Sequence, residues 1–428
     1  MISRFAWYLG ETLKLLWVRV VAFAILAVVS ALLARVMAPY LPEDLALQTG
    51  SEAVSQLLGI LTSSMLAVTT FSLSIAVSAF AAAAQSATPR ATVLLQQDRT
   101  TQNVLATFLG AFLFGLVGLI ALHAEFYNSS GKVVVFLFTI VVIGLVVLAL
   151  IGWIGHLMQF GRMGDTLDRV EQAAADALGK RLEDPFLGAR ALLDAPDGAG
   201  ATVLANDAGY IQHVDMNALQ DCAESLEATV ILRHLPGVFV APGTPLLSVT
   251  AGSVDDDATE VLRQAIKIGA NRSFSEDPRF GLIVLTEIAS RALSPAVNDP
   301  GTAIDIIGRH VRILSRWHAR EDAEVRFDRV LVPPITPQDA IEDAFRPIAR
   351  DGAALSEVQI RLQKALAVLC VGGPDPLASA CMSMSREALE RLDAESFVRA
   401  EHVAIRSAAP CVQGPPVPDA VGLIPSAG

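Results

Sequence analysis

Four long stretches of apolar residues, nearly free of charge, occupy the first 160 residues of the chain, and no comparable stretch follows them. They run from about residue 15 to 37, 53 to 84, 104 to 122 and 133 to 157. A helix of about 20 apolar residues crosses the hydrocarbon core of a bilayer, and each stretch meets that length. The first is much longer than the roughly 7–15-residue apolar segment of a cleavable signal peptide. The pattern therefore predicts an α-helical integral membrane protein with four transmembrane helices over residues 1–160.

Lys and Arg side chains gather on one side of these predicted spans. They are Arg4, Lys14 and Arg19 before or at the start of the first span, Arg90 and Arg99 between the second and third, and Arg162, Arg169, Lys180 and Arg181 after the fourth. The two opposite loops carry mainly acidic residues, such as Glu43 and Glu125. Because basic residues accumulate in short cytoplasmic loops, we expect both termini to be cytoplasmic, together with everything that follows the fourth span.

The second span is unusually long and rich in hydroxyl groups. No charged residue occurs from residue 53 to 89, and Thr70, Ser74 and Ser78 recur every four residues on one helix face. One interpretation is a face that packs against neighbouring helices, because small and hydroxyl side chains permit close approach. The other is the lining of a pore, in which hydroxyls replace the hydration of an ion. No span carries an ionisable residue at its centre, which argues against a proton relay.

The remaining residues divide into four segments by their patterns. Residues 161–200 predict an amphipathic connecting helix and a linker, and residues 201–250 alternate short apolar runs with Gly and Pro turns, which indicates a small β-rich module. No lysine lies between Arg181 and Lys267, so this module is not a biotinyl or lipoyl carrier. Residues 251–408 predict a helical domain, and residues 409–428 a disordered tail. The cytoplasmic region is therefore expected to be α+β.

The helical domain contains the most distinctive stretch of the chain. Asp-Pro pairs at 277–278 and 299–300 are typical of helix starts, and the sequence SPAVND between the two predicted helices forms a polar elbow. One interpretation is turn chemistry alone, because Ser, Asn and Asp satisfy free backbone groups. The other is a ligand-binding site for a small anion at two helix N-termini. Its candidate residues are Arg272, Asp277, Arg279, Arg291, Ser294, Asn298 and Asp299.

A basic stripe follows the elbow, formed by Arg309, Arg312, Arg316 and Arg320 at helical spacing. This stripe is either a solvated face paired with Glu321, Asp322 and Glu324 or a contact with anionic lipid. The acidic first turn around Asp339, Glu342 and Asp343 suggests a metal cluster, but an acidic turn complements the helix dipole without any ion.

Composition excludes several classes of function. Hydrophobic residues make up 53% of the 428 residues and the net charge is −12, which argues against nucleic acid as a partner. The four cysteines have no CxxC spacing and the seven histidines are scattered, so we expect no metal site and no cofactor. Because the chain lacks a GxSxG, HExxH, Walker A or dinucleotide motif, we expect that it is not an enzyme.

Several motifs together resemble a bacterial family of predicted membrane proteins known as domain of unknown function 2254. They are FSLSIAVSAFAAAAQSATPR in the second span, GYIQHVD, PGVFVAPGTPL, EDPRFG and RALSPAVNDPGTA. The likeness covers roughly residues 10 to 400, and it implies a multi-pass protein of the bacterial inner membrane without supplying catalytic residues or a substrate. Gly301 stands where the family pattern leads us to expect a larger residue.

The function favoured by the sequence is an oligomeric channel or related permeation protein with a cytoplasmic region that senses and gates. The alternative is a non-conducting membrane scaffold or sensor that recruits a cytoplasmic partner. The expected partners are the lipid bilayer, further copies of the chain, and a small anionic ligand or a cytoplasmic protein.

Overall fold

A computed structural model describes residues 16–37, 51–96, 98–126, 129–158, 160–193, 200–317 and 324–410. The chain divides into two compact units, residues 1–166 and residues 167–428. The first unit is helical, and the second combines helices with small sheets. The chain is thus mostly helical with a small sheet region, as the sequence predicts. The expected disordered tail falls almost entirely on residues 411–428, which lie outside the described residues.

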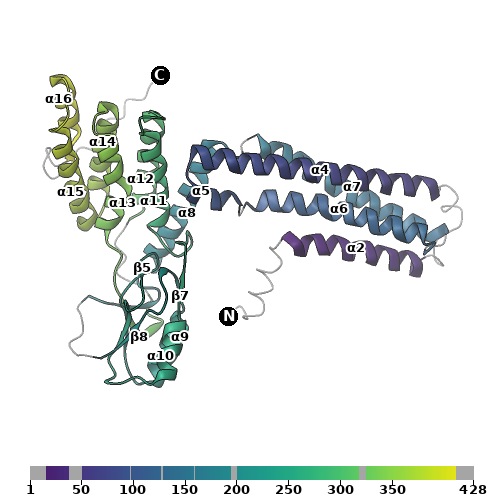
Figure 1. Ribbon diagram of the computed structural model, residues 1–428, viewed down its shortest axis with the longest axis horizontal. Helices are drawn as coiled ribbons and strands as arrows, with labels where there is room; N and C mark the ends of the chain where they lie inside the picture. Colours follow the sequence, from purple (N-terminus) through teal and green to yellow (C-terminus); the bar gives the residue numbers. More distant parts are fainter. Residues whose placement is uncertain are drawn as a thin grey trace. The chain divides into compact units, whose positions relative to one another are not determined.

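The first unit consists of long apolar helices that lie side by side (Figure 1). They are α2 (Leu16–Met37), α4 (Ser51–Ser86), α6 (Arg99–His123) and α7 (Ser129–Leu157), with the short α5 (Pro89–Gln96) after α4. Among the described residues, α4, α6 and α7 are long and apolar enough to cross a membrane. In α2 the apolar segment, Val20–Val36, is shorter. The structure therefore supports three of the four spans that the sequence predicts, and α2 as a fourth is not shown.

Helix α6 holds this unit together, because it packs against α2, α4 and α7. Its apolar sequence is interrupted by glycines where a neighbouring helix comes close. A Cβ on Gly115 would collide with the hydroxyl of Thr62 on α4, and one on Gly110 would meet the ring of Phe23 on α2. Small residues at helix contacts let backbones approach closely, which is the usual way to gain packing energy in a bilayer.

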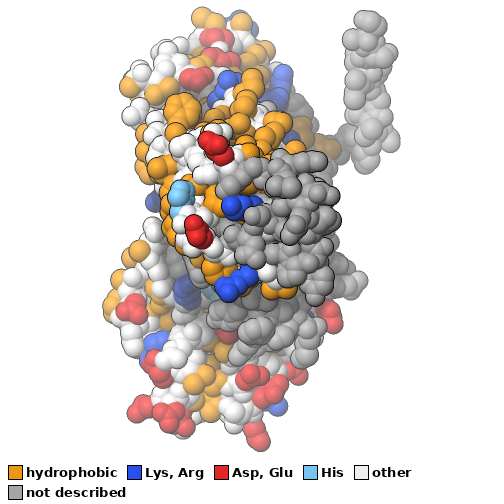
Figure 2. All heavy atoms as spheres, turned by 90° about the vertical axis from the view of Figure 1, so that its right-hand side faces the viewer, with side chains coloured by type: hydrophobic (Ala, Val, Ile, Leu, Met, Phe, Trp, Pro, Cys, Tyr) orange, Lys and Arg blue, Asp and Glu red, His pale blue; other side chains and the backbone are white. Residues whose placement is uncertain are grey.

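Charged residues mark the ends of these helices. Arg35 lies in the last turn of α2, Glu52 in the first turn of α4, and Lys132 near the start of α7. The guanidinium of Arg35 lies over the ring of Phe126, 5.2 Å from its centre. Figure 2 looks onto this end and shows charged side chains scattered among hydrophobic ones. Such residues at helix ends and apolar ones between them are typical of a bilayer-spanning bundle.

The second unit contains most of α8, from Leu167 onward, and then forms two small sheets. The five-stranded sheet has the order β1-β8-β4-β6-β2, and the three-stranded sheet has the order β5-β3-β7. β8 pairs in parallel with both β1 and β4, and the other pairings are antiparallel. The elements are α8 (Met163–Glu183), β1 (Ala189–Ala191), β2 (Ala201–Leu204), β3 (Gly209–Val214), α9 (Met216–Ser225), β4 (Val230–Leu232), β5 (Phe239–Val240), β6 (Pro245–Val249), α10 (Asp256–Gln264), β7 (Ile266–Gly269) and β8 (Phe327–Val332).

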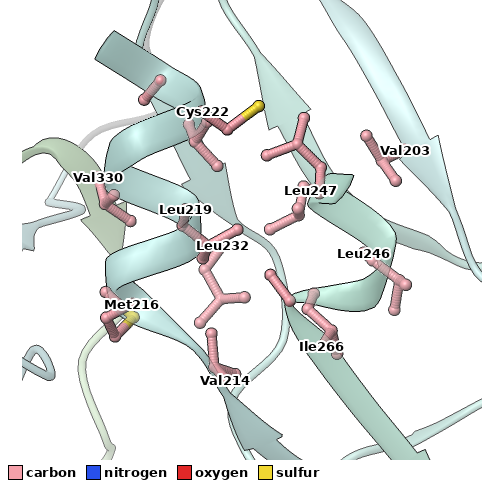
Figure 3. Close-up of a cluster of buried hydrophobic side chains, with 14 of the residues drawn as sticks. Val203, Val214, Met216, Leu219, Cys222, Leu232, Leu246, Leu247, Ile266 and Val330 are labelled. Carbon is pink, nitrogen blue, oxygen red and sulfur yellow. The ribbon is translucent and has the colours of Figure 1, made fainter. Parts of the chain in front are cut away.

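The expected β-rich range of 201–250 holds β2 to β6, and the sheets also include β1, β7 and β8 from outside it. Their core is apolar and closed by α9, whose Leu219 and Cys222 point toward Leu232 and Leu247 of the five-stranded sheet (Figure 3). Leu219, Leu232 and Leu247 are fully buried. Apolar burial of this kind contributes roughly 1.5–3 kcal/mol for each side chain.

A layer of helices completes the second unit and lies side by side in Figure 1. Its members are α11 (Phe280–Ala292), α12 (Pro300–Leu314), α13 (Pro337–Asp351), α14 (Ser356–Gly372), α15 (Asp375–Leu392) and α16 (Arg399–Ala408). Helix α11 contacts α12 and α13, and it also meets α8, where Gly281 lies directly against Ala174. This contact places the middle of α8 beside the start of α11.

Candidate functional site

Four guanidinium groups line one hollow of the second unit, which we call the arginine pocket. Its volume is about 350 Å³. Three loops meet there: the turn between β4 and β5, the segment between β7 and α11, and the loop between β8 and α13. The lining residues are Arg181, Arg233, His234, Leu235, Pro236, Gly237, Val238, Arg272, Asp277, Pro278, Arg279, Pro333, Pro334, Ile335, Thr336 and Asp339. The pocket therefore brings together the PGVFV and EDPRFG motifs, which lie far apart in the sequence.

Asp277 anchors the wall of the pocket. Its carboxylate is only 1% exposed and accepts a hydrogen bond from Arg272 Nε at 2.6 Å and another from the backbone N–H of Arg279 at 3.1 Å. Gly237 packs directly on this carboxylate with a φ of 98°, so a side chain at that position would be strained and would collide. The sequence predicts Asp277 as the N-cap of a helix, but α11 begins at Phe280 with Arg279 as its N-cap residue. The Asp277 carboxylate is shared between Arg272 and the backbone N–H of Arg279, and the helix starts three residues after it.

Arg279 joins the pocket to α13. It donates from Nη1 to Asp339 at 2.9 Å and from Nε to Asp343 at 2.6 Å. Burial lowers the pKa of Arg279, but the hydrogen bond and charge of Asp343 and the charge of Asp339 outweigh it and raise the pKa overall. Burial raises the pKa of Asp343 despite its bond to Arg279. Asp339 and Asp343, one turn apart on α13, therefore hold Arg279 between them.

Arg181, in the last turn of α8, is the most deeply buried arginine of the pocket, at 4% exposed. Its Nη2 donates to the backbone oxygen of Glu276 at 3.4 Å, and its buried Nη1 has no partner among the described residues. Burial lowers the pKa of Arg181, and the charges of Glu276, Asp184 and Asp277 only partly offset that effect. This guanidinium is thus a buried charge without a paired carboxylate in the described part of the chain.

The opposite rim of the pocket carries Arg233 and His234. Arg233 is exposed, and its Nε donates to the hydroxyl of Ser248 at 2.8 Å. Burial, followed by the charge of Arg233, lowers the pKa of His234, so that its imidazole is neutral at physiological pH. A neutral imidazole both donates and accepts a hydrogen bond, which adds a polar group of either kind to the rim.

The other predicted site residues lie at the far end of α11. Its 13 residues separate the arginine pocket from the polar elbow by roughly 20 Å. Arg291 and Asn298 are exposed, and Ser294 donates to the backbone oxygen of Arg291 at 2.6 Å. Asp299 is the N-cap of α12, as predicted, and the hydrogen bonds from the hydroxyl and N–H of Thr302 lower its pKa. The seven candidate residues therefore do not form a single site.

The basic stripe on α12 is paired with acidic residues on α8. Arg309, 9% exposed, donates from Nη1 to Asp168 and Glu171, both at 2.7 Å, and from Nε to Asp305 at 2.8 Å. Arg312 makes a two-point contact with Glu171. These two arginines are thus paired, but with Asp168, Glu171 and Asp305 and not with the predicted Glu321, Asp322 and Glu324, of which the first two lie outside the described residues. Arg320 lies outside the described residues.

The hydroxyl face of α4 is exposed in the single chain. Thr70, Ser74 and Ser78 each donate to a carbonyl of their own helix at 2.9 Å, the acceptors being Ala67, Thr70 and Ser74. Helix α4 is continuous over 36 residues, which is longer than the roughly 20 residues that cross a bilayer, and no break in the helix shortens it. Whether this face lines a pore or packs against another helix stays a prediction.

Sequence reasoning overlooked several residues of the arginine pocket. The turn at Pro236-Gly237 is visible in the sequence, but there it indicates only one of the turns of the β-rich module. Asp339 and Asp343 share a helix face but were explained by the helix dipole alone. Nothing in the pattern around Arg181 distinguishes it from an ordinary basic residue in the last turn of a helix. The described residues contain no group of three or more His, Cys, Asp or Glu side chains that could hold a metal.

Comparison with known proteins places this architecture in a family. The family model "Predicted membrane protein (DUF2254)" matches residues 14–368. The uncharacterised proteins Mb1321c of Mycobacterium bovis and Rv1290c of Mycobacterium tuberculosis are each 28% identical over 232 residues, which cover 49% of this chain and 42% of the relative. The match therefore spans less than half the length of these relatives. No solved structure matches the chain. The match over residues 14–368 means that the chain belongs to the DUF2254 family of predicted membrane proteins.

Proposed function

We propose that the chain is an oligomeric channel or related permeation protein of the bacterial inner membrane, in which copies of α4 surround the path and the second unit senses a ligand and gates. The proposal places both termini and the second unit in the cytoplasm, as the distribution of Lys and Arg predicts. It assigns the chain no catalytic role. It is carried by a single observation, the uncovered hydroxyl face of α4.

Helix α4 is the least enclosed of the three candidate spans. Only 17% of its most apolar window is buried within the chain, compared with 44% in α6 and 22% in α7. Its exposed surface contains a stripe of small residues, with large apolar side chains such as Phe71 and Val77 beside it. The stripe consists of Ala67, Thr70, Ser74, Ser78 and Ala81. Small residues favour close contact between helices, whereas large apolar residues suit lipid, so the stripe fits the axis of an assembly.

Flux through liposomes tests conduction. Full-length protein is reconstituted with and without the substitutions Ser74→Leu and Ser78→Leu, and Phe71→Leu is the matched control on the neighbouring surface. We expect ion or small-solute flux from the wild type, its loss in both serine variants, and its retention in the control. A wild type that gives no flux at any voltage would rule out conduction.

Cross-linking tests the assembly independently of flux. In a chain whose native cysteines are replaced, Ser74→Cys is expected to form disulfides between copies under mild oxidation in the membrane. Phe71→Cys is expected to form few. Equal cross-linking at both positions would mean that the small-residue stripe does not face another copy.

A second candidate is a non-conducting scaffold or sensor that recruits a cytoplasmic partner. The observation that favours it is that the hydroxyls of Thr70, Ser74 and Ser78 are already satisfied by backbone carbonyls, so they need neither water nor an ion. This candidate predicts that purification of the tagged full-length chain yields a partner in stoichiometric amount. It also predicts no flux in the liposome assay.

A further inference from the structure

Arg181 is a buried charge that the described residues compensate only in part, because Glu276, Asp184 and Asp277 lie near it but form no ion pair with it. It is 4% exposed, its Nη1 has no hydrogen-bond partner among the described residues, and its one hydrogen bond, to the backbone oxygen of Glu276, is long at 3.4 Å. An ion taken from water into a protein without a counter-charge costs several kcal/mol. Such a group persists where a binding partner supplies the missing charge, which points to an anion from outside the chain.

The arginine pocket offers further donors around Arg181. Arg272 uses only its Nε, for Asp277, and Arg233 only its Nε, for Ser248, so their Nη groups make no hydrogen bond within the described residues. The lining contains four arginines but only two carboxylates. Guanidinium groups bind the oxygens of phosphate and carboxylate through paired N–H donors. Because these groups come from three different loops or helices, they suit a tetrahedral group with several oxygens better than a planar one.

We propose that the arginine pocket is a binding site for a small phosphate-bearing ligand, held by Arg181, Arg233 and Arg272. A volume of about 350 Å³ fits a compact molecule, since ligand pockets run from about 300 to 1,000 Å³. The phosphate belongs either to a soluble metabolite or to a lipid headgroup. The inference rests on the sensing part of the proposed function, to which it gives a location and a ligand class, and it does not depend on conduction.

Helix α8 connects the arginine pocket to other helices of the chain. Arg181 lies on α8, which follows α7 directly in the chain, and Asp168 and Glu171 near the other end of α8 are bound to Arg309 of α12. A ligand that binds Arg181 would therefore hold the C-terminal end of α8 against the loops of the pocket. If the ligand binds more tightly when α8 is in one position than in another, binding shifts the population of the protein toward the position that binds better.

Calorimetric titration of the full-length protein in detergent tests the site, with inorganic pyrophosphate as the soluble probe and short-chain phosphatidic acid as the lipid probe. The variants are Arg181→Met and Arg233→Met, and Arg386→Met, an exposed residue of α15 outside the pocket, is the control. We expect at least one probe to bind the wild type and the control equally. Both pocket variants should bind at least about tenfold more weakly, because each loses a charged hydrogen bond. The probe that binds identifies the source of the phosphate.

A thermal denaturation measurement without ligand separates a binding role of Arg181 from a structural one. Removal of an unpaired buried charge stabilises a protein, so Arg181→Met is expected to raise the melting temperature of the free protein. A lowered melting temperature would mean that Arg181 supports the fold and would overturn the inference. So would failure of both probes to bind, or binding that neither pocket variant weakens. Binding without flux would reject the permeation proposal alone, and flux without binding would reject this site alone.

Discussion

Acidification is expected to destabilise the second unit through one buried histidine of α12. His310 is fully buried between α11 and α13, where its Nε2 contacts the hydroxyl of Thr286 at 3.0 Å and its Nδ1 has no partner among the described residues. The hydroxyl of Thr286 donates to the backbone oxygen of Ala344, so it accepts from Nε2 and the imidazole is neutral. Burial lowers the pKa of His310 from 6.5 to about 3.

The sign and size of the effect follow from proton linkage. Below pH 6.5 the unfolded chain binds a proton at His310, whereas the native imidazole stays neutral until about pH 3. The contribution of this neutral imidazole to stability is therefore fully present above 6.5 and is lost as the pH falls toward 3. In that window the free energy of unfolding changes by about 1.4 kcal/mol for each pH unit, which amounts to about 2 kcal/mol between about pH 7 and pH 5.

Denaturant unfolding of the full-length protein in detergent, followed by Trp317 fluorescence, measures this change. Trp317 is buried directly after α12, and replacement of Trp7, Trp17 and Trp153 by Phe leaves it as the one indole of the chain. The comparison is with His310→Gln, whose amide can donate to the same hydroxyl but does not titrate. We expect the wild type to lose about 2 kcal/mol more than this variant over the same pH range. An equal loss in both proteins would refute the assignment of the acid sensitivity to His310.

Three further predictions use the same fluorescence assay. Gly237→Ala and Gly243→Ala both introduce a side chain at positive φ, 98° and 87°, but only the side chain at position 237 collides with a carboxylate, that of Asp277. We expect Gly237→Ala to lower the free energy of unfolding by about 1–3 kcal/mol more than Gly243→Ala does. Equal losses would contradict the contact between Gly237 and Asp277. Gly281→Ala is expected to lower the free energy of unfolding by about 1–3 kcal/mol, because the added methyl group pushes α8 away from α11. Gly308→Ala is expected to raise it by up to about 1 kcal/mol, because Gly308 faces only the flexible ends of arginine side chains. The reverse order would show that α8 is not tightly packed against Gly281. Arg309→Met is expected to lower the free energy of unfolding by about 1–2 kcal/mol, because it removes the ion pairs that join α12 to α8. An unchanged free energy of unfolding would mean that these ion pairs contribute no more than the hydration of the separate charges.

The sequence predicts those elements whose cause is local. The helices α4, α6 and α7 follow from continuous apolar runs, and the Asp299-Pro300 pair is sufficient to start α12 because both capping interactions lie within the motif. Asp277-Pro278 has the same local form, yet α11 begins only at Phe280, and the Asp277 carboxylate accepts hydrogen bonds both from the backbone N–H of Arg279 and from Arg272, five residues earlier. A local motif does not by itself show which additional groups its side chains bind in the folded chain.

The arginine pocket could be predicted only in part for the same reason. Arg272 and Arg279 were visible beside a motif, but Arg181 is distinguished only by burial, which depends on residues almost a hundred positions away. The strands β1 and β8 are short, and their parallel pairing depends on chain segments far apart in sequence. The role of Arg309 in the basic stripe likewise depends on Asp168 and Glu171, which lie on a different helix and far away in the sequence.

The parallel pairing of β1 with β8 imposes an order on biosynthesis. Ala189 pairs with Phe327, so the five-stranded sheet cannot be completed until the whole of α11 and α12 has left the ribosome. By then α4, α6 and α7 have long been synthesised, and their insertion into the membrane precedes closure of the sheet. Pairings between distant segments form slowly, and unpaired strand edges are prone to aggregation while they wait. Slow elongation after residue 332 would therefore be harmless, whereas a truncated chain that ends before β8 would expose β1 and β4 as open edges.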